Sequence, residues 1–171
     1  MNENFIKIDP KEINENIFNL IGKDWMLITA GNIESFNTMT ASWGGFGILW
    51  NKSVAYIFIR PQRFTYSFTE KFDQFTLCFF NDKYRDILKF CGTKSGRDTD
   101  KIKETGLLPK ETELGNIYFK QSKLIIECKK LYFDDLKPEN FIDKSIEKNY
   151  PKQDYHRLYI GEIINCFKNI E

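Results

Sequence analysis

The sequence has few of the residues that build metal sites and disulfide frameworks. It contains a single histidine, His156, and four widely spaced cysteines that form no CxxC pair. A zinc site or a disulfide framework needs several such residues at characteristic spacings, so neither is expected. We therefore predict no bound metal and, in a reducing cytoplasm, free thiols at Cys78, Cys91, Cys128 and Cys166.

The chain also lacks an excess of charge of either sign and lacks long hydrophobic runs. Its 25 Lys and Arg residues offset 24 Asp and Glu residues, which gives a net charge of +1. No global attraction to nucleic acid or to a membrane surface is expected, so any anion site must be local. The longest apolar runs have the length of a strand, and the start MNENFIKIDP is too polar for a signal peptide. We predict a cytoplasmic protein with neither nucleic acid nor a membrane among its partners.

Neither of the common nucleotide-binding loops occurs in the sequence. The glycines at 44, 45 and 47 lie in GGFG, which differs from the dinucleotide pattern GxGxxG, and no GxxxxGK[ST] sequence is found. This argues against Rossmann and P-loop sites. On spacing alone, a tight hairpin explains these glycines better than a nucleotide-binding loop does.

Aromatic residues, by contrast, are abundant: they make up 16% of the chain, and phenylalanine is the most frequent of them. They favour strands and supply flat contact surfaces. A chain of 171 residues can bury a substantial core as one domain, and we find no internal repeat, low-complexity segment or linker. We predict a single domain over residues 1–171, mainly β with flanking α-helices.

Apolar and alternating segments predict the strands, and shorter amphipathic segments predict helices between them. We expect strands over residues 25–30, 37–42, 54–59, 75–80, 117–119, 124–133 and 156–167. Short helices are expected over residues 65–71, 84–90 and 99–105. Thr65 could cap the first of these helices. Gly31 and Asn32 predict a hairpin turn, and Gly161 predicts a bulge or a close backbone approach inside the last strand.

Two further segments do not follow the strand pattern. Asp9 and Pro10 predict the start of a helix that ends at Gly22 and buries one apolar face. Residues 134–151 are polar and contain two prolines, which predicts an insertion loop with a short helix near residues 138–141.

The segment 37–65 contains the densest set of candidate ligand-binding groups. Small polar residues and Trp43 precede the glycines, and the strand over 54–59 leads into the sequence RPQRFT. A glycine turn between two strands would bring the polar cluster and the arginines to the same end of a sheet. Small hydroxyls and turn amides can line a planar heteroaromatic ring, whereas guanidinium groups suit a phosphate.

Two segments could bind an anion. Arg60 and Arg63 lie next to a predicted helix N-terminus, which favours a phosphate site, although many arginines at strand ends are only solvated charge. The loop from Thr93 to Lys101 could form an anion-binding nest of backbone amides. A plain connection between two helices explains that loop equally well.

Four motifs together resemble those of a known family. NTMTASWGGFG, RPQRFT, CGTKSGRDTDKI and HRLYIGEI occur in this order between residues 37 and 163. With these motifs the chain resembles the flavin reductase-like family of FMN-binding split barrels, which includes flavoredoxin. The resemblance implies an antiparallel Greek-key split β-barrel and a homodimer with FMN near the subunit interface. It also changes the interpretation of the glycine segment in favour of a ligand site.

The resemblance further implies which residues would bind the cofactor. Those along the flavin ring and the ribityl chain would be Asn37, Thr38, Met39, Thr40, Ser42 and Trp43. Those near the phosphate or the ribityl chain would be Arg60, Gln62, Arg63 and Thr65, with Ser95 and Lys101 also at the phosphate. His156 is by default a structural histidine, and the resemblance adds a role in nicotinamide or substrate contact.

The expected function is that of an oxidoreductase that passes hydride or electrons from NAD(P)H through FMN to an acceptor. The sequence does not identify the acceptor, for which a redox protein is one candidate. Two alternatives stay open: a flavoredoxin-type electron carrier reduced by a protein partner, and a non-catalytic flavin-binding module. The insertion over residues 134–151 bears on this choice, because it could cover the flavin ring and exclude free nicotinamide.

Overall fold

Strands dominate the chain, as the aromatic-rich composition predicts. The computed structural model describes residues 4–170. Its helices are α1 (Phe64–Lys71), α2 (Arg85–Thr93) and α3 (Lys101–Thr105). Its strands are β1 (Phe5–Ile8), β2 (Met26–Asn32), β3 (Ser35–Ala41), β4 (Gly44–Leu49), β5 (Lys52–Ile59), β6 (Gln74–Phe79), β7 (Pro109–Glu111), β8 (Ile117–Phe119), β9 (Leu124–Asp135) and β10 (Arg157–Asn169).

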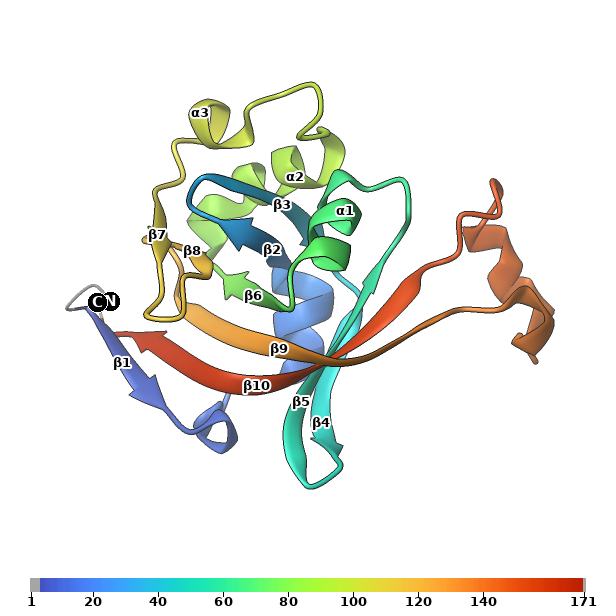
Figure 1. Ribbon diagram of the computed structural model, residues 1–171, viewed down its shortest axis with the longest axis horizontal. Coiled ribbons are helices and arrows are strands. Elements are labelled where there is room, and N and C mark those ends of the chain that lie inside the picture. Colours follow the sequence, from blue (N-terminus) through green and yellow to red (C-terminus); the bar gives the residue numbers. More distant parts are fainter. Residues whose placement is uncertain (1–3, 171) are drawn as a thin grey trace.

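One strongly bent antiparallel sheet forms the body of the molecule (Figure 1). Its order is β3-β2-β6-β9-β10-β5-β4, with β1 paired to β10, and β7 and β8 form a separate pair. The first half of β10 pairs with β5 and its end pairs with β1, while β9 runs along its other edge. The prediction of a mainly β, antiparallel barrel with flanking helices is confirmed.

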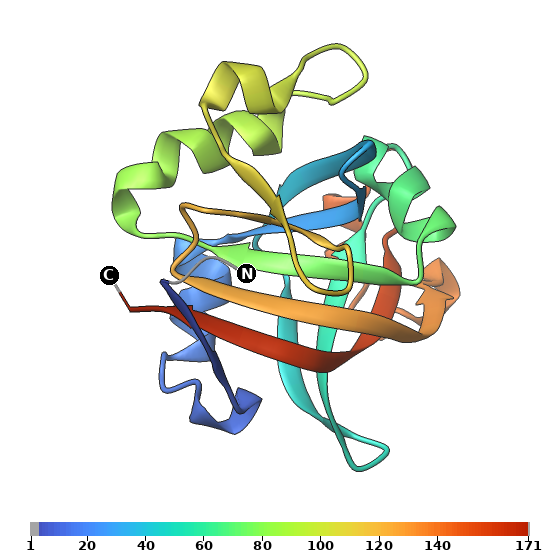
Figure 2. The same cartoon turned by 60° about the vertical axis from the view of Figure 1, so that its left-hand side comes forward.

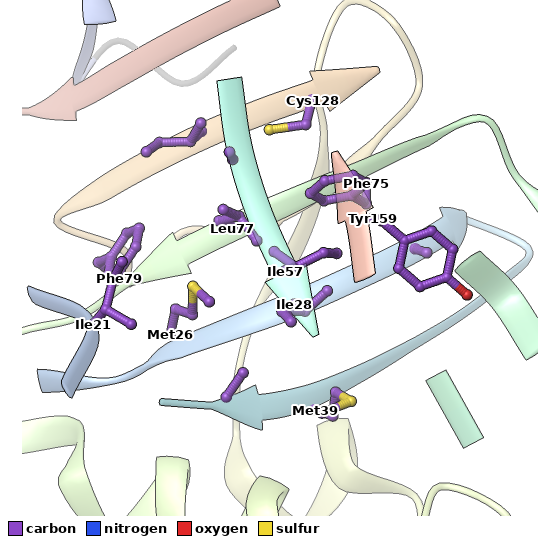
Figure 3. Packing of buried hydrophobic residues seen from close by; sticks show 14 of the residues in the cluster. Ile21, Met26, Ile28, Met39, Ile57, Phe75, Leu77, Phe79, Cys128 and Tyr159 are labelled. Carbon is purple, nitrogen blue, oxygen red and sulfur yellow. The ribbon is translucent and has the colours of Figure 1, made fainter. Parts of the chain in front are cut away.

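The main hydrophobic core fills the inside of the curved sheet. Side chains from several strands meet there, among them Ile28, Met39, Ile57, Phe75 and Tyr159 (Figure 3). α2 and β8 lie on the outer side of the sheet (Figure 2). A second apolar cluster fills the space between them and the sheet. β6 is therefore buried on both faces, which explains why its sequence QFTLCF hardly alternates. All four cysteines lie in these clusters as buried free thiols, as predicted.

Gly161 confirms the irregularity expected in the last strand. The register between β10 and β9 shifts between Ile160 and Gly161. A Cβ atom at Gly161 would lie 2.7 Å from Cζ of Phe75 and 3.0 Å from Cβ of Cys128. Glycine is therefore required here because the core packs directly against the backbone.

The prediction of one helix over residues 9–22 is wrong. Asp9 does form a capping box with Glu12, but the 3₁₀ turn that it caps ends there, and the chain is extended at Ile13. A separate π-helical segment, Asn19–Asp24, follows. The side chains of Leu20 and Ile21 in this segment pack into the barrel core. These positions are therefore apolar because of tertiary packing and not because they belong to one continuous amphipathic helix.

The prediction that the glycines at 44–47 form a turn is also wrong. They lie in the edge strand β4, and the turn follows at Trp50 and Asn51, whose φ angles are 51° and 58°. β3 and β5 are therefore not neighbours in the sheet. The three predicted short helices do correspond to α1, α2 and α3. Thr65, however, does not cap α1, because Arg63 occupies the N-cap position.

Residues 136–155 form an arm that connects β9 to β10 and projects from the barrel (Figure 1). The short helix predicted near 138–141 is present as the 3₁₀ turn Pro138–Asn140. A second 3₁₀ segment, Lys144–Asn149, and the short strands β1 and β7 were not predicted. Among the described residues, no helix is long and apolar enough to cross a membrane.

Candidate functional site

Two adjoining cavities lie where β3 approaches the segment that follows β5. The larger has a volume of about 310 Å³ and the smaller a volume of about 160 Å³. Met39, Gln62 and Arg63 line both cavities, which therefore share a wall. The polar residues of β3 and the arginines after β5 are thus brought together, as predicted, although their strands are not neighbours.

The larger cavity has flat aromatic walls. Trp43 and Phe58 line it together with His156, whose ring centroid lies 5.0 Å from that of Trp43 and 6.4 Å from that of Phe58. Thr40 and Ser42 supply hydroxyl groups, and the hydroxyl of Thr40 donates to a backbone carbonyl of α2. Aromatic side chains beside hydroxyl, amide and guanidinium groups suit a planar heteroaromatic ligand with polar edges.

The smaller cavity is lined by cations and hydroxyl groups. Arg63 and Lys101 line it together with Thr65 and Ser95. No carboxylate is found among the described residues that line this cavity. Ammonium, guanidinium and hydroxyl groups all donate hydrogen bonds to phosphate oxygens, so this composition suits an anion.

Lys101 is a buried cation with a donor to spare. Its side chain is 5% exposed, and Nζ donates to the backbone oxygens of Thr38 (2.7 Å) and Cys91 (2.9 Å). Because an ammonium group has three N–H donors, one remains for a ligand in the smaller cavity. Burial, assisted by the charge of Arg63 and opposed by Cys91, lowers the pKa of Lys101 to about 8.

Arg63 adds positive charge at the wall between the cavities. Its Nη1 donates to the backbone oxygen of Gly92 (2.8 Å), which leaves other guanidinium N–H groups available. Burial, followed by the charge of Arg60, lowers the pKa of Arg63. The neighbouring cations thus repel one another, and a bound anion would offset this repulsion.

The sequence match that decides the family covers most of the chain and all of this site. A model of the flavin reductase-like domain matches residues 19–169. The chain belongs to the flavin reductase-like family. No curated protein matches it.

Solved structures with the same fold include other members of this family. A flavin reductase-like, FMN-binding domain from Shewanella baltica superposes with a TM-score of 0.70 and 16% identity, over 97% of this chain and 78% of that chain. Flavoredoxin of Desulfovibrio vulgaris gives a TM-score of 0.67 and 18% identity, over 95% and 78%. An NADH:FAD oxidoreductase from Streptomyces globisporus gives 0.63 and 12%, over 85% and 74%. At these identities the similarity shows a shared split-barrel fold.

In this flavin reductase-like domain, some residues predicted to bind the flavin also make hydrogen bonds within the protein. The hydroxyl of Thr38 lies 2.9 Å from that of Thr29 in the neighbouring strand β2. Thr38 lines neither of these two cavities, but it lines a third cavity that, like the smaller one, borders Lys101. The amide of Asn37 lies 2.6 Å from Oγ1 of Thr65. This pair joins β3 to α1, and both of its residues also line the smaller cavity.

Arg60 and Gln62 hold the arm against the flavin reductase-like barrel. Arg60 donates to Oδ2 of Asp154 (2.9 Å) and to the backbone oxygen of Asn149 (2.8 Å), and Gln62 donates to the same Asp154 oxygen. Arg60 lines the larger cavity but not the smaller one. The phosphate contact predicted for it stays a prediction.

Sequence reasoning missed Phe58 and Gly96 among the residues that shape the site. Phe58 lies between buried Ile57 and Ile59 in β5, so alternation alone could have placed it on the opposite face. A Cβ atom at Gly96 would lie 2.0 Å from Oδ1 of Asn37, which explains why the motif CGTKSGRDTDKI has a glycine there. Its loop can lie against β3 only without a side chain at this position.

His156 lies between the arm and the larger cavity. It is 7% exposed, and its Nδ1 lies 2.9 Å from the hydroxyl of Tyr150 in the arm. Burial, followed by the charge of Arg60, lowers the pKa of His156 to about 4. The imidazole is therefore neutral at pH 7.

The low pKa of His156 predicts a loss of stability in acid. Between pH 6.5 and 4 the unfolded chain binds a proton at His156 that the folded chain does not, so the free energy of unfolding falls as pH is lowered through this range. Urea unfolding at pH 7 and at pH 4.5 measures the fall. His156→Gln removes this contribution, so its free energy of unfolding should fall less between the two pH values. Some fall remains because the carboxylates titrate in both proteins. An equal fall in both proteins would contradict the low pKa of His156.

Proposed function

We propose that this protein binds FMN in the two adjoining cavities and reduces it with NADH or NADPH for transfer of electrons to an acceptor. The observation that carries the proposal is the wall shared by an aromatic-lined cavity and a cationic one. FMN has the same division into a flat ring system and a phosphate. The family match and the FMN named for the Shewanella baltica protein support the same cofactor.

The residues present fit this cofactor. Trp43 and Phe58 would hold the ring, with Ser42 at its polar edge, while Arg63 and Lys101 would hold the phosphate. Bound FMN supplies the redox chemistry, namely acceptance of a hydride from the nicotinamide and onward transfer of electrons. The chain itself orients the ring, places positive charge at the phosphate and presents a neutral imidazole to the larger cavity.

We also propose a homodimer in a reducing cytoplasm. Trp43 is 46% exposed and Ile48 of the edge strand β4 is 65% exposed, so a second copy of the chain could cover both. Buried free thiols fit a reducing compartment. Sedimentation with and without FMN tests the assembly, and a monomer under both conditions would contradict it.

The position of the arm favours a second candidate, an electron carrier that is reduced by another protein. The arm bonds to Arg60, Gln62 and His156, all of which line the larger cavity. An arm fixed at this place could restrict the approach of a free nicotinamide. A carrier would then keep FMN bound and receive electrons only from its protein partner.

The visible spectrum of the FMN-loaded protein distinguishes these functions. It is recorded without oxygen before and after addition of NADH or NADPH. Bleaching of the flavin bands well above the rate for free FMN is the expected result, and the faster donor identifies the preference. Bands that bleach with dithionite but not with either nucleotide would overturn the reductase and favour the carrier.

A further inference from the structure

Tyr150 connects the arm to the wall of the larger cavity. Its side chain is 5% exposed, and its ring stacks on Phe141, with centroids 5.9 Å apart and an interplanar angle of 17°. The ring of Tyr155 lies 4.9 Å away, and the guanidinium carbon of Arg60 lies 5.1 Å from the ring centroid. These contacts hold the ring of Tyr150 so that its hydroxyl lies 2.9 Å from Nδ1 of His156.

The direction of this hydrogen bond follows from the partners that are available to the hydroxyl of Tyr150. Burial raises the pKa of Tyr150, so its hydroxyl keeps its proton at neutral pH. Within residues 4–170, Nδ1 of His156 is the one hydrogen-bond partner of that hydroxyl. If Nδ1 carried a hydrogen, the hydroxyl proton would have no acceptor, and an unpaired buried donor is unfavourable. Tyr150 is therefore the donor and Nδ1 the acceptor.

The second ring nitrogen of His156 is then the one that carries the hydrogen. Nε2 makes no hydrogen bond to any described residue, and His156 lines the larger cavity beside Trp43. The charged groups that act on the imidazole are Arg60, at the end of β5, and Asp154, in the arm. Arg60 is paired with Oδ2 of Asp154 at 2.9 Å, and Oδ1 of Asp154 is buried without a partner among the described residues. Neither Arg60 nor Asp154 makes a hydrogen bond to the imidazole, whose bonded neighbour is Tyr150.

We propose that Tyr150 is a positioning residue that fixes His156 in the tautomer with hydrogen on Nε2, so that a neutral N–H donor faces the larger cavity. The tautomer itself does not depend on the ligand, whereas the role of the donor rests on the proposed function. A donor at the acceptor edge of a flavin stabilises the electron-rich reduced ring and raises its reduction potential. Through Tyr150, the arm, which lines neither cavity, would thus influence a cofactor bound there.

The tautomer can be read directly, because His156 is the only histidine in the chain. Long-range proton–nitrogen correlation spectra of ¹⁵N-labelled protein, without flavin at pH 7, show which ring nitrogen carries the hydrogen. The expected spectrum has one protonated nitrogen, Nε2, and one bare nitrogen, Nδ1. A protonated Nδ1 in the wild-type protein would overturn the proposal, whatever the protein proves to bind.

Two tyrosine variants separate positioning from packing. Tyr150→Phe removes the donor but keeps the stacked ring, and a mixture of both tautomers is expected. Tyr155→Phe is the matched control, because Tyr155 belongs to the same ring stack but its hydroxyl has no hydrogen bond to the described residues. It should keep the wild-type spectrum. A pure Nε2–H spectrum in Tyr150→Phe would show that Tyr150 does not set the tautomer.

The reduction potential of bound FMN tests the consequence of the tautomer. The midpoint potential should become more negative in Tyr150→Phe and more negative still in His156→Leu, and stay unchanged in Tyr155→Phe. His156→Gln places an amide N–H near the former position of Nε2, and this donor does not depend on Tyr150 to fix a tautomer. Its midpoint potential should therefore lie closer to that of the wild-type protein than to that of His156→Leu. Equal potentials in all variants would refute the donor role. Failure to bind FMN would refute the proposed function while the spectrum still decides the tautomer.

Discussion

Replacement of Lys101 by methionine is expected to weaken FMN binding roughly ten- to a hundredfold. A hydrogen bond to a charged group contributes about 1.5–3 kcal/mol, and about 1.4 kcal/mol corresponds to a factor of ten in affinity. Lys101 is the buried cation of the smaller cavity, and it has one N–H donor left for a phosphate. Quenching of flavin fluorescence measures the affinity. Lys103→Met, an exposed position in the same helix, is the matched control and should bind FMN like the wild-type protein.

The pH dependence of binding gives a second test of Lys101. The pKa of about 8 means that the free protein loses this charge as pH rises through 8, whereas a phosphate monoester is already a dianion above about pH 6. The affinity of the wild-type protein for FMN should therefore fall above pH 8. In Lys101→Met the fall should be absent, and an equal fall in both proteins would place the titrating group elsewhere.

Replacement of Gly161 by valine is expected to cause the largest loss of stability. Even the first side-chain atom would lie 2.7 Å from Phe75 and 3.0 Å from Cys128, so these buried core side chains or the backbone would have to shift. Overpacking of this kind costs about 1–3 kcal/mol and occasionally more. Urea unfolding should show a lower midpoint for Gly161→Val than for Gly161→Ala.

Two further variants test the cause of that loss. Phe75→Leu in the Gly161→Ala background removes the ring atoms that the new methyl group meets, so part of the combined loss should be recovered relative to the sum of the single changes. Gly22→Ala is the control, because a Cβ atom at Gly22 meets nothing within 4 Å. A strictly additive double variant would show that the contact with Phe75 is not the cause.

The strands were predictable from the sequence because their signal is local. β6 and β8 are short apolar segments between turn signals, and Gly161 marked the bulge of β10. For the segment before β2 the prediction of one helix was wrong. Its apolar residues have a helical spacing, but tertiary packing divides the segment into a 3₁₀ turn and a π-helical segment. Likewise, GGFG is typical of a turn, yet it pairs with β5 as an edge strand.

The candidate site was predictable as a set of residues, but its internal contacts were not. Motif resemblance selected residues that line the cavities, such as Trp43, Arg63 and Lys101. It could not show that Arg60 bonds to Asp154, which lies 94 residues further along the chain. Nor could it show that the hydroxyl of Thr38 bonds to that of Thr29 in β2, because both contacts depend on how distant segments pack.

The most direct test of the central claim is a comparison of FMN with riboflavin, which has the same ring but no phosphate. Fluorescence titration of the wild-type protein at pH 7 measures both affinities. If the aromatic and cationic cavities bind one ligand, FMN should bind at least tenfold more tightly than riboflavin, and Lys101→Met should remove most of the difference. Equal affinities in the wild-type protein, or no binding of either flavin, would contradict this account.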